Sequence, residues 1–156
     1  MRLTNATEQA LAIMAILSIQ KREVPVSSES IYMKLSVSPS YVKKLLRKLV
    51  VSKLIGGVSG NNGGFYLEKE IENISLLEIV EAIEGPLETF PNMGVFQRAF
   101  SEFDEIAQNG HNIVAAYFSE ADRAWEDKLR NTSIKEVVKQ VFENETTIPE
   151  KNWNEI

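Results

Sequence analysis

Four basic residues lie within six positions of one another in the first third of the chain, and their types suit contact with a nucleic-acid backbone. They are Lys43, Lys44, Arg47 and Lys48. Lysine and arginine donate charge-assisted hydrogen bonds to phosphate oxygens. Three hydroxyl residues come just before them, and such side chains can contact base edges: Ser38, Ser40 and Tyr41. An ordinary solvated helix face is the alternative interpretation of the four cations.

The charge of the chain is divided unevenly between its two halves. Residues 1–67 carry nine basic and three acidic side chains, which gives a net charge of +6. Residues 68–156 carry eight basic and nineteen acidic side chains, which gives −11. A basic half beside an acidic half is typical of proteins that bind nucleic acid through the basic part, although chance segregation of surface charge is the alternative.

The residue types that most enzymes and metal sites need are scarce. The sequence has no cysteine, which excludes disulfides, thiol catalysis and cysteine-ligated zinc or iron–sulfur centres. Its one histidine, His111, belongs to no recognisable nucleophile motif, and we expect it to be a surface or helix-start residue. No glycine-rich phosphate loop is followed by Lys-Ser or Lys-Thr. We therefore expect neither an enzyme nor a metal or other cofactor.

Nothing in the sequence suggests a membrane protein. Its composition, 44% hydrophobic and 25% charged, is that of an ordinary globular protein. The longest apolar run, residues 10–17, is far shorter than the roughly 20 residues that cross a bilayer. No secretory signal pattern is present. The expectation is a cytoplasmic protein without membrane contact.

The elements around the basic cluster are expected to form a helix-turn-helix. A short helix capped within residues 27–28 is followed by a break at residues 36–37. Ser38 is a good N-cap and Pro39 suits the first helical position, so a second helix should run from there to about Lys53. Helical spacing assigns its buried stripe to Val42, Leu45, Leu46 and Leu49.

A β-hairpin is predicted directly after this second helix. Residues 54–58 and 64–67 are short strand candidates, and the five residues between them favour a turn. A helix-turn-helix followed by a hairpin is typical of a winged helix. Three residues of the hairpin tip, Ser59, Asn61 and Asn62, are candidates for contact with phosphate or sugar; a role in the turn alone is the equal alternative for the asparagines.

Two further helices carry more apolar surface than one small core covers, which predicts a homodimer. The first helix is expected over residues 4–19 and is apolar on every face between residues 10 and 17. A long helix over residues 112–130 keeps an apolar stripe for about five turns. The residues expected to form the dimer contact are Leu11, Met14, Tyr117, Phe118, Ala121, Trp125 and Leu129.

The rest of the chain gives weaker patterns. Ser75 and Glu78 form a capping box for a helix that Gly85-Pro86 ends, and a last helix should run from residue 132 or 133 to about Glu143. Residues 95–107 are expected to form a helix that Asn109-Gly110 terminates. The aromatic residues of this region line either a core or an effector pocket, with the core favoured: Phe90, Met93, Phe96, Phe100, Phe103 and Trp125.

The predicted domain organisation follows from these elements. Residues 1–85 are assigned to the winged helix-turn-helix domain, and residues 86–111 to a connector or effector region. Residues 112–145 are assigned to dimerisation helices, and residues 146–156 to a tail that we expect to be frayed. The fold class is mainly α, with a small β-hairpin wing and a long C-terminal dimerisation helix.

An ordered set of motifs resembles the Rrf family of bacterial winged-helix transcription regulators over about residues 1–87. The motifs are Met1-Arg2-Leu3-Thr4, Val37-Ser38-Pro39-Ser40-Tyr41-Val42, Leu45-Leu46, Leu54-Ile55, Gly63-Gly64-Phe65-Tyr66-Leu67, Ile74-Ser75-Leu76 and Ala82-Ile83-Glu84-Gly85. The resemblance implies a homodimer whose second motif helix enters the major groove and whose wing reaches the minor groove of a pseudo-palindromic operator.

The chain departs from this family pattern in two places. Many members hold an iron–sulfur cluster through three cysteines in the segment that corresponds to residues 86–110, where this chain has none. Wing tips in the family usually carry an arginine before the glycine, whereas Ser59 precedes Gly60 here. We therefore expect a cluster-free regulator, most simply a repressor, that is controlled either by a small-molecule or protein effector at the region between Phe90 and Trp125 or by protein abundance alone. A winged-helix adapter that binds protein and not DNA is the rival hypothesis.

Overall fold

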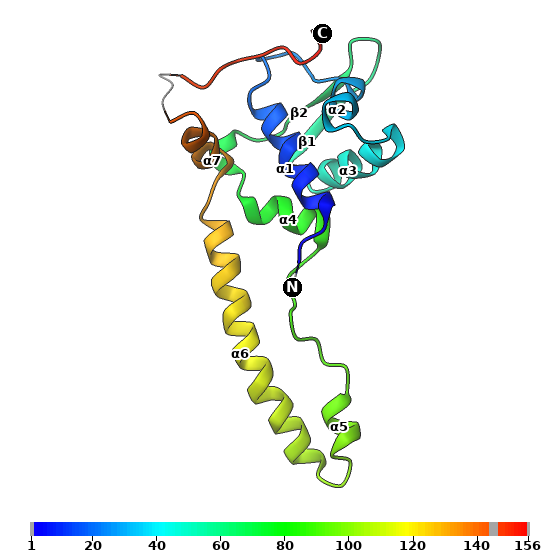
Figure 1. The fold of residues 1–156 in the computed structure, drawn as a ribbon, viewed down its shortest axis with the longest axis vertical. Coiled ribbons are helices and arrows are strands. Elements are labelled where there is room, and N and C mark those ends of the chain that lie inside the picture. Colours follow the sequence, from blue (N-terminus) through cyan, green and yellow to red (C-terminus); the bar gives the residue numbers. More distant parts are fainter. Residues whose placement is uncertain (1, 144–146, 156) are drawn as a thin grey trace. The chain divides into compact units, whose positions relative to one another are not determined.

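The computed structural model of the chain describes residues 2–143 and 147–155. The fold is mainly helical with a two-stranded hairpin, which confirms the predicted fold class (Figure 1). Two compact units are distinguished, one of residues 86–128 and one that combines residues 2–85 with residues 129–155. Within the described residues, no helix has both the length and the apolar character needed to cross a bilayer.

The larger unit is a helical cluster around one core. Its helices are α1 (Asn5–Ser18), α2 (Ser28–Leu35), α3 (Pro39–Val51), the 3-10 turn η1 (Ile71–Asn73), α4 (Leu76–Glu84) and α7 (Ile134–Val141). Serines cap four of them through side-chain hydrogen bonds from the first turn: Ser27, Ser38, Ser75 and Ser133. The predicted capping box of Ser75 and Glu78 is present. These local signals explain why the helix starts agree with the sequence.

The hairpin follows α3 after a sharp turn. Lys53 adopts a positive φ of 57°, and the chain then enters β1 (Ile55–Val58), which pairs antiparallel with β2 (Gly64–Leu67). A second contact extends the hairpin on its other edge, where Val26 and Phe65 exchange main-chain hydrogen bonds of 2.9 and 2.8 Å. Gly64 is required there because a Cβ would collide with the Val26 main chain. The wing is therefore fixed to the segment before α2.

The smaller unit differs from the prediction for residues 95–110. The chain forms a short helix α5 (Val95–Ala99), turns at residues 100–103, and begins the long helix α6 (Asp104–Arg130). The expected helix over 95–107 and the expected break at Asn109-Gly110 are both wrong. Two acidic residues in the first turn of α6 suit the positive end of the helix dipole, and Gly110 lies inside the helix against the ring of Phe96.

His111 is not the surface or helix-start residue that the sequence suggested. It lies in the third turn of α6 and is only 7% exposed. Its ring stacks on Phe90 with centroids 5.4 Å apart, and the edge of Phe96 lies 5.9 Å away. Phe90 also stacks on Phe118 at 4.9 Å. These rings form an aromatic core for the unit, as was favoured for Phe90 and Phe96.

The described part of the C-terminal tail, residues 147–155, is ordered, so the prediction of a frayed tail is wrong there. Lys151 pairs with the end of α1 through main-chain hydrogen bonds of 2.9 Å to Ile19 and Lys21. The indole of Trp153 donates a 3.0 Å hydrogen bond to the carbonyl of Ile16 and packs against the core. The tail thus covers part of the apolar α1 surface that the sequence assigned to a partner chain.

Candidate nucleic-acid interface

The helix-turn-helix is built by α2, α3 and the turn between them. Ser36 adopts a left-handed conformation with φ 53° and ends α2, and the Ser38 hydroxyl accepts a 3.4 Å hydrogen bond from the Tyr41 amide at the start of α3. The predicted stripe of α3 is buried to 3% exposure or less: Val42, Leu45, Leu46 and Leu49. Burial of each such side chain contributes about 1.5–3 kcal/mol, so this face fixes the rotation of α3 about its axis.

The opposite side of α3 presents the polar residues to solvent. All seven candidates on this element are exposed: Ser38, Ser40, Tyr41, Lys43, Lys44, Arg47 and Lys48. Within the described part of the chain, Lys43, Lys44 and Arg47 form no ion pair and no side-chain hydrogen bond. Exposed cations without an internal partner remain free to bind an external anion such as phosphate.

Lys48 differs from the other three cations. Its Nζ donates a 2.6 Å hydrogen bond to the main-chain carbonyl of Ile83, at the C-terminal end of α4. An ammonium at a helix C-terminus is favourable because the last carbonyls lack helical partners and carry the negative end of the dipole. Lys48 is thus engaged within the unit, an arrangement that its spacing on α3 could not reveal.

The next residue along α4, Glu84, connects the same corner to α1. Its Oε1 accepts hydrogen bonds from the amide and the hydroxyl of Thr4, at 2.8 and 2.6 Å, and another from the hydroxyl of Thr7. The hydrogen bond from the Thr4 side chain, followed by that from Thr7, holds the pKa of Glu84 below its ordinary value of 4.5, and the charge of Lys48 acts in the same direction. Thr4 occupies the N-cap position of α1, but its hydroxyl bonds to Glu84 and does not cap its own helix.

The three candidates for DNA contact at the tip of the wing lie in solvent. Ser59, Asn61 and Asn62 are all exposed, and the turn is closed by a 3.0 Å hydrogen bond from the Gly63 amide to the Gly60 carbonyl. Gly60 has φ 111°, a conformation that residues with a side chain rarely adopt. The tip carries no basic side chain, so any contact that it makes with DNA relies on neutral polar groups.

The residues assigned to dimerisation fall into two groups. Met14 is 1% exposed and belongs to the core of the larger unit, and Leu11 is partly buried against that core, so neither is presented as a free contact surface. On α6, Tyr117 is 72% and Phe118 43% exposed, Ala121 is exposed, and Trp125 and Leu129 are half-buried. Ile106 and Ile113 of the same helix, which were not among the predicted contacts, are 69% and 52% exposed. Ile106 lies seven residues before Ile113, and Ile113 lies four residues before Tyr117, so the three side chains share one face of α6.

Neither of the two described cavities is lined by the residues between Phe90 and Trp125 that were the candidates for an effector pocket. One is lined by residues between Leu17 and Ile71 together with Ile148 and Glu150, and the other by residues of 72–81 and 130–133. Half-buried Phe90 and Phe96 pack against buried His111, whereas Met93, Phe100 and Phe103 are exposed at 70%, 53% and 57%.

Buried helix-turn-helix packing, an outward basic helix face and an adjoining hairpin define a winged helix-turn-helix protein. The chain matches the Rrf2 family, described as "Iron-dependent Transcriptional regulator", over residues 3–140. It belongs to this family of DNA-binding transcription regulators and is not an enzyme. Membership therefore favours DNA binding over the adapter hypothesis.

Relatives and solved structures agree with this assignment. YwgB of Bacillus subtilis, named as an HTH-type transcriptional regulator, is 31% identical over 92% of this chain and 88% of its own length. YffB of Lactococcus lactis, named in the same way, is 30% identical over 92% of this chain and 91% of its own. IscR of T. potens superposes with a TM-score of 0.67 and 19% identity, over 94% of this chain and 93% of that one. CymR of B. subtilis superposes with a TM-score of 0.62 and 20% identity, over 88% of this chain and 95% of that one.

The residues of this chain do not fit a cysteine-held iron–sulfur cluster. The family description mentions iron, but the sequence has no cysteine. Among the residues that the structure describes, no group of three or more histidine, aspartate or glutamate side chains is placed to hold a metal ion. Clusters in proteins are bound by thiolates, with histidine replacing only part of the set. No step of the function is therefore assigned to a cluster.

Proposed function

We propose that the protein is a homodimeric, cluster-free repressor that acts in the cytoplasm on a pseudo-palindromic operator. The observation that carries the proposal is the outward face of α3, where Lys43, Lys44 and Arg47 are exposed and unpaired within the described residues. In helix-turn-helix proteins the second helix lies in the major groove and its N-terminal residues contact base edges. Ser40 and Tyr41 occupy those positions here.

In this proposal the cations and the hydroxyls have different tasks. Lys44 and Arg47 bind phosphates and supply affinity that does not depend on sequence, with Lys43 beside them. Ser40 and Tyr41 contribute to the choice of sequence, and Ser38 mainly caps the helix. Asn61, Asn62 and Ser59 approach the sugar–phosphate backbone from the wing. A bound dimer represses by blocking access of the polymerase to the promoter.

The apolar stripe of α6 supports the dimer. Ile106, Ile113 and Tyr117 expose large apolar side chains along one line of the helix, with Ala121 continuing it. Clustered exposed apolar residues on one helix face are typical of an interface between chains. A two-fold dimer would present two α3 helices to major grooves about one helical turn, roughly 34 Å, apart.

Selection of bound duplexes from a randomised DNA library tests the proposal. We expect the enriched sequences to contain an inverted repeat whose half-sites are about 10 base pairs apart centre to centre. Enrichment of a single unrepeated half-site would contradict the dimeric mode of binding, and no enrichment would contradict sequence-specific recognition.

Sedimentation tests the dimer separately. The wild-type chain should sediment at about twice its mass of 17.6 kDa. Tyr117→Glu should shift the protein toward the monomer, because it introduces a charge into the proposed contact. Ser119→Glu is the matched control, since Ser119 is exposed and lies about 200° around the helix from Tyr117. A wild-type monomer that binds DNA would contradict the two-fold arrangement.

A further inference from the structure

The segment of residues 25–27 lies between the wing and the C-terminal tail and is bonded to both. The amide and the carbonyl of Val26 exchange hydrogen bonds of 2.9 and 2.8 Å with the main chain of Phe65 in β2. In an extended strand, neighbouring residues present their main-chain groups to opposite edges. The carbonyl of Pro25 and the amide of Ser27 therefore face away from the wing, and their partner has to come from another element.

Asn154 of the tail supplies both partners through one side chain. Its Nδ2 donates a 2.8 Å hydrogen bond to the carbonyl of Pro25, and its Oδ1 accepts one of 2.9 Å from the amide of Ser27. A side-chain amide carries a donor and an acceptor side by side, as a peptide group does, and only asparagine and glutamine have one. Asn154 thus takes the place of a further strand on the edge opposite Phe65.

The same side chain completes the cap of α2. In the capping box of α4, the Ser75 hydroxyl accepts a hydrogen bond from the amide of Glu78, and the Glu78 carboxylate accepts one from the amide of Ser75. Ser27 likewise accepts from the amide of Ser30, but the short Ser30 side chain bonds to the Ser27 hydroxyl and not to its amide. Asn154 accepts from that amide instead, and its Oδ1 also accepts a 3.2 Å hydrogen bond from the Ser30 hydroxyl.

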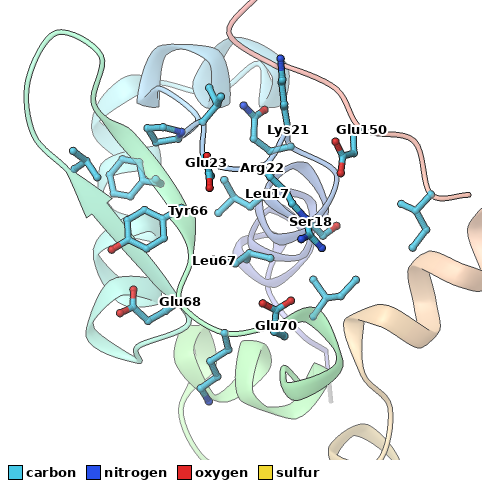
Figure 2. Close-up of a pocket in the computed structure, with 18 residues that line it drawn as sticks. Leu17, Ser18, Lys21, Arg22, Glu23, Tyr66, Leu67, Glu68, Glu70 and Glu150 are labelled. Carbon is cyan, nitrogen blue, oxygen red and sulfur yellow. The ribbon is translucent and has the colours of Figure 1, made fainter.

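The tail is anchored to the end of α1 before it reaches α2. The indole of Trp153 donates to the carbonyl of Ile16, one of the last four carbonyls of α1, which no amide of the helix itself reaches. The main-chain amide of Trp153 donates a 2.9 Å hydrogen bond to the side chain of Gln20. Figure 2 shows Glu150 of the tail beside Lys21, in the turn that follows α1. The tail therefore closes the end of α1 and the start of α2 together.

We propose that Asn154 is a positioning residue for DNA recognition, which holds the start of α2 and the wing at one spacing. α2 packs against α3, and β2 belongs to the wing, so the two elements proposed to contact DNA meet at residues 25–27. This role rests on the proposed function, because it acts through α3 and the wing tip. Asn154 itself contacts no DNA in this proposal.

The expected effect is on DNA affinity more than on stability. Asn154 is exposed and polar, whereas its neighbour Trp153 packs against the core. Loss of the Asn154 hydrogen bonds leaves the core intact and allows several spacings of wing and α2. The apparent affinity then falls in proportion to the fraction of molecules that hold the spacing that DNA requires.

Amide hydrogen exchange of the full-length protein, measured by NMR without DNA, tests the contact itself. In Asn154→Ala the amide of Ser27 should exchange about fivefold faster, because its acceptor is lost, and the amide of Phe65 should follow as the strand edge loosens. In Asn154→Asp the Ser27 amide should stay protected, since the carboxylate still accepts but cannot donate to Pro25. Unchanged exchange at Ser27 in Asn154→Ala would overturn the proposal.

Operator affinity tests the positioning role. Asn154→Ala should weaken binding to the selected operator by about fivefold while its melting temperature stays within about 2 °C of the wild type. Asn73→Ala is the matched control, because Asn73 is an exposed asparagine of η1 in the same unit, and it should change neither quantity. Faster exchange at Ser27 with unchanged operator affinity would refute the positioning role.

A second substitution supplies the rescue. Glutamine at position 30, the third residue of α2, can accept from the Ser27 amide as Glu78 does from Ser75 in α4, and it adds no charge. Ser30→Gln combined with Asn154→Ala should therefore restore the slow exchange of Ser27 and at least half of the lost operator affinity. Ser30→Ala in the same background should restore neither. Restored protection at Ser27 without any gain in affinity would contradict the link between the cap of α2 and DNA binding.

The two measurements separate this inference from the proposed function. If the wild type binds operator and Asn154→Ala binds it equally well, the positioning role is refuted and the proposed function stands. If the wild type selects and binds no operator while Asn154→Ala still exchanges faster at Ser27, the proposed function is refuted and Asn154 is only a cap of α2.

Discussion

The Nζ of Lys48 in α3, the second helix of the helix-turn-helix, donates a 2.6 Å hydrogen bond to the main-chain carbonyl of Ile83 near the end of α4. The neighbouring Glu84 in turn receives hydrogen bonds from Thr4 and Thr7 of the α1 region. One corner of the fold thus joins α1, α3 and α4 just before Gly85, the last residue of the first of the two segments that form the larger unit. Lys48 therefore positions α3, whereas Lys44 and Arg47 make no such bond within the described residues and are available for the proposed DNA contact.

Replacement of Lys48 should affect stability more than the salt dependence of DNA binding. Lys48→Met keeps the aliphatic stem and removes one charge-assisted hydrogen bond at an exposed site, so we expect a loss of about 1 kcal/mol in the free energy of unfolding. Urea denaturation measures it. Lys43→Met is the matched control on the same helix and should change stability by less than about 0.5 kcal/mol. Equal effects of the two substitutions would contradict the positioning role.

Glu84 should make stability depend on pH. Its pKa is lowered in the folded state, chiefly by the Thr4 side chain, so the ionised carboxylate stabilises the fold. That contribution is complete above the unfolded pKa, near 4.5, and is lost as the pH falls through the lower folded value. Glu84→Gln should therefore lower the melting temperature at pH 7 and make progressively less difference below pH 4.5. A constant difference at every pH would show that the charge of Glu84 is irrelevant.

The tail should contribute to the stability of the larger unit. Trp153 is half-buried, packs against the core and binds the Ile16 carbonyl, so Trp153→Ala should cost about 2 kcal/mol in the free energy of unfolding. Thr147→Ala alters an exposed tail residue and should change little. The measurement is the urea midpoint of each variant. A Trp153→Ala midpoint equal to that of the wild type would mean that the tail does not pack in solution.

Reconstitution with iron should leave the protein colourless. The sequence has no thiol, and thiolates are the usual ligands of iron–sulfur clusters. After anaerobic incubation with iron and sulfide, the desalted protein should have no cluster absorbance band in the visible range and unchanged operator affinity. A stoichiometric cluster band accompanied by altered DNA binding would contradict cluster-free regulation.

The winged helix could be predicted from the sequence because its signals are local. Ser38 and Pro39 define the start of α3, and the glycine-rich segment before Phe65 defines the hairpin. The buried stripe of α3 follows from helical spacing alone. These elements can be predicted without knowing which distant residues contact them. Their observed bounds agree with the prediction to within about two residues.

The errors occur where long-range contacts decide the outcome. Gly110 was interpreted as a helix break, but contacts around Phe96 and His111 retain it inside α6. The tail was interpreted as frayed because its pairing partners, Ile19 and Gln20, are about 130 residues away in sequence. The hydrogen bond of Lys48 to Ile83 is a long-range contact of the same kind, because spacing on one helix cannot reveal an acceptor on another; the DNA contact of Lys48 stays a prediction.

Salt dependence of duplex binding tests the central claim most directly. Each phosphate that the protein neutralises contributes about 0.9 to the slope of log affinity against log salt concentration. We predict a steep slope for the wild type. The double variant Lys44→Ala with Arg47→Ala should lose the contribution of about two phosphates to this slope, whereas Lys48→Met should leave the slope nearly unchanged. If the double variant keeps both the affinity and the slope of the wild type, the outward face of α3 does not bind DNA.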